Sequence, residues 1–202
     1  MVKEISATNL EKYVRDLAGF RTRHTLSPNN PKDGISASQE YVLNHFKSFE
    51  AASGGRLTAF LDTYTIPADN RRIPADVQSA NVMATLKGTD PSDNRVFIIS
   101  AHVDSRALDV MNTNIDAPGA NDDGSGVAAV IELARIMSQK SYPSTIIFVA
   151  VSGEEQGLKG AAYLAEKAKK ENTKSTVLLC FRIFKYKFQK IRSIAKSISL
   201  RV

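Results

Sequence analysis

The amino-acid sequence predicts an α/β fold with a largely parallel central sheet and helices on both faces. Two short, continuous apolar runs, Val96 to Ala101 and Thr145 to Val151, are typical of strands buried on both faces. A helical pattern over about Ser125 to Ser138 separates them, and another follows over about Leu158 to Lys170. A further β-like run covers Thr176 to Phe184. Strands and helices that alternate in this way indicate parallel strands joined by crossover helices.

The N-terminal third predicts two helices and two strands. A first helix is expected from Thr8 to Gly19, with Thr8 as its cap, and a second from Ser38 to Phe49. Strands are expected over Leu57 to Ile66 and over Ala80 to Leu86, because both runs are rich in β-branched and apolar residues. No internal repeat interrupts this order.

Composition indicates a soluble protein with one globular domain. The chain has 202 residues, 43% of them hydrophobic, and its one cysteine, Cys180, excludes an internal disulfide. No apolar run approaches the roughly 18 residues that span a bilayer, so no membrane partner is expected. The first ten residues lack the apolar stretch of a signal peptide, so no export route is expected from this sequence.

The net charge of +6 comes entirely from the last 23 residues. Residues 180–202 contain seven Lys and Arg and no acid, whereas residues 1–179 hold 20 basic and 21 acidic side chains. We therefore expect a body at 1–179 and an atypical basic tail at 180–202. The body has no basic stripe, which argues against nucleic-acid binding. The tail has apolar residues at roughly helical spacing, so an amphipathic helix that binds a membrane surface or a partner is the alternative to a truncated or frame-shifted end.

Three groups of acidic and histidine side chains follow predicted strand ends, where ligands bind in open α/β sheets. His102 and Asp104 follow the first buried strand, Asp122-Asp123 precedes a Gly-Ser-Gly helix start, and Glu154-Glu155 follows the next buried strand. Asp104 can orient the ring of His102 for a metal, and adjacent glutamates can divide metal binding and base catalysis between them. Each motif has an ordinary alternative: a polar pair at a turn, a helix N-cap, or a solvated first helical turn.

Taken together, the strings SAHVDS, APGANDDGSGVAAVIELAR and IIFVAVSGEEQGLKGAAYLAEK resemble the di-zinc metallo-aminopeptidases, a family that also contains glutaminyl cyclases. The segment LAGFRTRHTLSP resembles the start of their catalytic domain. The resemblance runs from about Asn9 to Leu179. It implies two zinc ions per complete site, a peptide substrate with a free N-terminus, and hydrolysis of its first residue. Members of this family are often exported.

The resemblance also implies a role for each site residue. His102 resembles a ligand of one zinc, Asp104 the acid that orients it, and Asp122 the aspartate that bridges both zincs. Glu154 resembles the general base and Glu155 a ligand of the other zinc. A non-proline cis peptide is implied between Asp122 and Asp123.

Two ligands of the family pattern have no counterpart. The family presents an aspartate after the next strand and a histidine much later, but residues 180–202 contain no Asp, Glu or His. Each zinc would keep two protein ligands, against the three typical of catalytic zinc. The sequence thus predicts an aminopeptidase domain that is incomplete and inactive as this chain. The alternatives are a non-catalytic interaction module on the same fold and, less favoured by the Glu154-Glu155 pair, glutaminyl cyclase chemistry.

Overall fold

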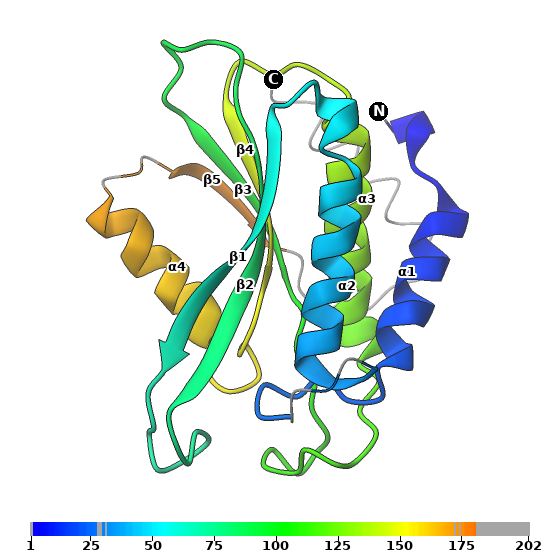
Figure 1. Ribbon diagram of the computed structural model, residues 1–202, viewed down its shortest axis with the longest axis vertical. Coiled ribbons are helices and arrows are strands. Elements are labelled where there is room, and N and C mark those ends of the chain that lie inside the picture. Colours follow the sequence, from blue (N-terminus) through cyan, green and yellow to red (C-terminus); the bar gives the residue numbers. More distant parts are fainter. Residues whose placement is uncertain (1, 28–29, 31, 172, 174, 181–202) are drawn as a thin grey trace.

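A five-stranded sheet forms the centre of the protein, in a computed structural model that describes residues 2–27, 30, 32–171, 173 and 175–180. The strand order is β1-β2-β4-β3-β5. The strands are β1 (Leu57–Ile66), β2 (Val77–Leu86), β3 (Val96–His102), β4 (Thr145–Val151) and β5 (Ser175–Cys180). Helices cover both faces of this sheet (Figure 1).

The sheet is mixed but largely parallel, which confirms the predicted fold class. Strand β3 pairs in parallel with both β4 and β5, whereas β2 pairs antiparallel with β1 and with β4. Strands β1, β3, β4 and β5 therefore run in one direction, and β2 runs against them. The carboxyl ends of β3 and β4 consequently lie side by side at one edge, where parallel sheets hold their ligands.

Helices α1 (Ala7–Gly19), α2 (Gly34–Ser48) and α3 (Ser125–Met137) pack on one face, and α4 (Lys159–Lys170) lies on the other (Figure 1). Helix α3 is buried at all but two of its positions, because it lies between the sheet and α1. The main apolar core fills this space. Its members include Val130 and Phe148, each fully buried, and burying one such side chain contributes about 1.5–3 kcal/mol. Among the described helices, none has both the length and the apolar character that a membrane span needs.

Several predicted boundaries differ from the structure for local reasons. Helix α1 begins at Ala7, and Ser6 rather than Thr8 caps it, because the Ser6 side chain accepts the Asn9 N–H at 3.2 Å. Strand β2 begins at Val77 rather than Ala80, because it pairs with β1 as far as Ile66, the last residue of β1, which lies opposite Val77.

Helix α2 begins at Gly34, four residues before the predicted start at Ser38. Gly34 has a φ of 80°, and the Ile35 N–H donates to the Ser27 hydroxyl at 2.9 Å. This hydrogen bond joins the start of α2 to the loop that contains Ser27, and the spacing of apolar residues in the sequence does not indicate it. The predicted basic tail lies outside the described residues after Cys180, so its amphipathic helix and the division between 1–179 and 180–202 stay predictions.

Candidate metal centre

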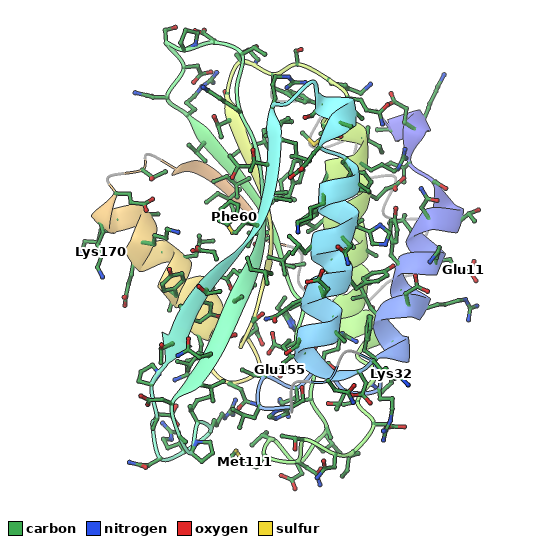
Figure 2. The ribbon with its side chains drawn as sticks, in the orientation of Figure 1. Glu11, Lys32, Phe60, Met111, Glu155 and Lys170 are labelled. Atoms are coloured by element: carbon green, nitrogen blue, oxygen red, sulfur yellow. The ribbon has the colours of Figure 1, made fainter. Side chains whose placement is uncertain are left out.

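The candidate site is built at the carboxyl ends of β3 and β4. The two strands are in register there, with His102 opposite Val151, and the Val103 N–H donates to the Val151 carbonyl at 2.8 Å. The residues that follow each strand therefore leave the sheet at the same level. Figure 2 shows Glu155 at this edge, beyond the end of β4.

His102 is buried and presents its two ring nitrogens to two different acids. Nδ1 lies 3.0 Å from the backbone carbonyl of Asp104 and 3.7 Å from its carboxylate. Nε2 lies 3.0 Å from Oδ1 of Asp122. Burial lowers the pKa of His102, but Asp104, Asp123 and Glu154 outweigh it and raise the pKa to about 10. The ring therefore lies in a surplus of negative charge, which favours a cation.

Asp104 joins the histidine segment to the glutamate turn. Its carboxylate is fully buried and accepts the backbone N–H groups of Glu154 at 3.2 Å and Glu155 at 3.0 Å. The Thr25 hydroxyl donates to the same carboxylate at 3.4 Å. Burial acts to raise the pKa of Asp104, but His102 and the two N–H groups hold it below its ordinary value. Asp104 is thus a charged carboxylate that orients both segments.

The loop before α3 carries the two aspartates through a short turn, Ala120–Gly124, in which Asp122 and Asp123 have non-helical backbone angles. The peptide bond between Asp122 and Asp123 is cis, which confirms the prediction. Asp123, for which no role was expected, is buried and accepts the backbone N–H groups of His102 and Gly126, both at 3.2 Å. Burial raises the pKa of Asp123 to about 7. The carboxylate of Asp122 remains partly exposed beside His102.

Arg23 is a second residue beside the site that the sequence motifs did not single out. Its side chain is fully buried and donates to four backbone carbonyls, those of Leu17, Val103, Pro118 and Gly119. Burial lowers the pKa of Arg23 to about 10, although Asp104, Asp123 and Asp122 act to raise it. Arg23 therefore ties the segment after His102 to the loop that carries Asp122. Its one sequence signal is its place in the family-like segment LAGFRTRHTLSP.

The glutamate turn is held by arginines from two other elements. Arg106 donates to Oε2 of Glu155 at 2.6 Å, and Arg72, from the β1–β2 connection, donates to the Glu155 carbonyl at 2.7 Å. Burial raises the pKa of Glu155, with Arg106 opposing and Asp104 and Asp122 adding to the rise. Neither arginine was singled out in the sequence, because nothing in its local pattern indicates a partner in another loop.

The structure thus brings His102 into contact with Asp122 on one side of its ring and with Asp104 on the other, and attaches the backbone of Glu154-Glu155 to Asp104. Imidazole nitrogen and carboxylate oxygen are the donors that zinc takes in catalytic sites, so these residues fit a zinc ion chemically. Within the described residues, no three His, Cys, Asp or Glu side chains form a group that could hold a metal ion. The individual roles of the five residues stay predictions.

Comparison with known families shows which protein family the chain belongs to. The model for peptidase family M28 matches residues 81–185, which is more than half of the chain and includes all five predicted site residues. The chain belongs to peptidase family M28. A probable zinc metalloprotease of Leptosphaeria maculans is 45% identical over 174 residues, which cover 86% of this chain and 40% of that protein. The M28 chain therefore spans about 40% of the length of this curated relative.

Solved structures share the fold of this M28 chain at low sequence identity. A Zn-dependent exopeptidase from Parabacteroides distasonis has a TM-score of 0.70 and 20% identity, over 96% of this chain and 70% of that one. A glutaminyl cyclase from Fimbriiglobus ruber has a TM-score of 0.68 and 20% identity, over 89% of this chain and 62% of that one. These likenesses establish the fold of the M28 chain.

Proposed function

We propose that this M28 chain carries the metal-binding edge of a zinc aminopeptidase, which hydrolyses the first residue of peptides with a free N-terminus. One observation carries the proposal: Nε2 of His102 and Oδ1 of Asp122 lie 3.0 Å apart, with Asp104 behind the ring at Nδ1. A carboxylate behind an imidazole is a common way to orient a histidine that binds metal. The 45% identical relative, a probable zinc metalloprotease, supports zinc as that metal.

Each side chain then has a distinct part. His102, Asp122 and Glu155 would hold the two zinc ions of a complete site, and Asp104 would orient His102. Bound zinc would supply Lewis acidity to the peptide carbonyl and acidity to the attacking water. Glu154 would accept the proton of that water as its oxygen bonds to the carbonyl carbon, and would return the proton to the amine that leaves.

A second function is favoured by a different observation. The carboxylate of Glu155 is already paired with Arg106, and within the described part of the chain no three-residue metal group exists. The 202 residues could therefore serve as a non-catalytic interaction module on the same fold. Zinc binding separates the two functions, because an interaction module has no need of it.

The test is a zinc titration of the purified 202-residue chain, followed by an assay with leucyl-anilide and its N-acetylated form. We expect zinc to bind weakly, His102→Asn to abolish binding, and this chain to be inactive or to cleave slowly, with any cleavage confined to the substrate that has a free amine. The weakness follows from two protein ligands per metal in place of three. A chain that binds no zinc supports the interaction module, and cleavage of the acetylated substrate contradicts an aminopeptidase.

A further inference from the structure

Glu155 is held at three points by three different side chains. Its N–H donates to Asp104 at 3.0 Å, its carbonyl accepts from Arg72 at 2.7 Å, and its Oε2 accepts from Nε of Arg106 at 2.6 Å. The first two contacts fix the backbone. Among the described residues, the contact with Arg106 is the one that fixes the direction of the carboxylate.

Arg106 is well placed to do this. It follows Asp104 by two residues, so one segment after β3 orients His102, anchors the Glu155 backbone and directs the Glu155 carboxylate. Its Nη1 donates to the Ala107 carbonyl at 3.1 Å, which restrains the guanidinium. The side chains of Arg106 and Glu155 are 29% and 15% exposed, so water screens this ion pair less than it screens a surface pair.

The geometry of the ion pair bears on metal binding. A guanidinium that competed for the whole carboxylate would pair with both oxygens through its fork of donors. Here one hydrogen bond joins Nε to Oε2, and the hydrogen bonds found among the described residues do not engage Oε1.

We propose that Arg106 is a positioning residue that holds Oε2 of Glu155, so that Oε1 is presented to a divalent metal ion. The inference rests on the proposed function, in which Arg106 has no assigned role. Carboxylates that bind metals are commonly fixed by such an outer hydrogen bond, and losing that bond typically weakens metal affinity by about 10–100-fold.

The experiment is a titration of the 202-residue chain with Co²⁺, monitored by visible absorption, and with Zn²⁺, monitored by calorimetry. Arg106→Gln removes the charge and Arg106→Lys retains it. Arg95→Gln is the matched control, because Arg95 pairs with Asp93 at 2.6 Å but lies before β3, at the end opposite His102. We expect about 10–100-fold weaker binding in Arg106→Gln, partial recovery in Arg106→Lys, and no change in the control. The Co²⁺ spectrum should change only in the Arg106 variants.

Unchanged or tighter metal binding in Arg106→Gln, with the wild type binding metal, overturns this inference alone. Tighter binding would mean that the arginine competes with the metal. A wild-type chain that binds neither metal overturns the proposed function and this inference with it. Thermal denaturation of each variant verifies that the fold is intact.

Discussion

Asp104 accepts the backbone N–H of Glu155 at 3.0 Å across 51 residues of sequence. The same carboxylate faces Nδ1 of His102 at 3.7 Å. One buried acid therefore sets the relative position of a predicted ligand of each metal ion. The two sequence motifs, which follow different strands, act as one unit because β3 and β4 end side by side.

Replacing this acid with its amide tests the unit. In Asp104→Asn, the side-chain N–H₂ must replace either Oδ1, which accepts the Glu154 N–H, or Oδ2, which accepts the Glu155 N–H. One buried donor therefore loses its partner at a cost of about 1–3 kcal/mol. Zinc affinity should fall by about 10–100-fold, as for other losses behind a ligand. Urea denaturation and zinc titration measure the two effects. Asp116→Asn, at an exposed acid paired with Arg21, is the control and should change neither.

Gly119 fixes the start of the aspartate turn. Its φ is 46°, and a Cβ there would lie 2.6 Å from the Asp122 carbonyl oxygen and 2.6 Å from Cβ of Ser105. Gly119→Ala should therefore lower the free energy of unfolding by about 1–3 kcal/mol and should weaken zinc binding by moving Asp122. In Gly19→Ala, the Cβ meets nothing within 4 Å, so this control should be neutral or slightly stabilising. Equal losses in the two variants would show that the turn geometry is unimportant.

The sequence predicts strands and motif positions well where a pattern is local. The bounds of β1 and β4 match the predicted runs, because strand burial leaves an alternating or continuous apolar pattern. The positions of His102 and Asp122 in the fold also follow from local patterns, because His102 follows a buried apolar run and Asp122 ends the loop before a helix. Arg23 and Arg106 were missed because their partners are a set of backbone carbonyls and a carboxylate on another loop. Such long-range contacts leave no periodic pattern in the amino-acid sequence.

His45 gives a prediction about pH that is independent of the metal centre. Its half-buried ring packs between Tyr13 and Tyr41, with centroids 4.8 and 4.6 Å away. Burial lowers the pKa of His45, Lys12 adds to this and Asp16 opposes it. The unfolded chain then binds a proton that the folded chain resists, so this residue makes stability fall as pH drops below about 6.5.

In His45→Gln, the loss of stability between about pH 7 and pH 5 should therefore be smaller than in the wild type. The measurement is the free energy of unfolding from urea titrations at several pH values. A variant whose pH dependence parallels that of the wild type would show that His45 titrates normally in the folded protein.

The last prediction separates the roles of the adjacent glutamates. Glu154→Gln removes a proton acceptor and leaves the predicted ligands in place, whereas Glu155→Gln removes the ligand held by Arg106. In the 202-residue chain, zinc affinity should stay within about threefold for Glu154→Gln, a change near 0.7 kcal/mol, and should fall steeply for Glu155→Gln.

Activity should follow the opposite logic. In any form of the protein that hydrolyses leucyl-anilide, Glu154→Gln should lower kcat by about 10²–10⁴-fold with zinc retained, because general-base catalysis contributes about that factor. For Glu155→Gln, excess zinc should restore part of the activity, because the defect is one of binding. The comparison fails if Glu154→Gln turns over like the wild type, which would mean that a different group accepts the proton of the attacking water. It also fails if both variants lose zinc equally, because adjacent side chains would then share one role.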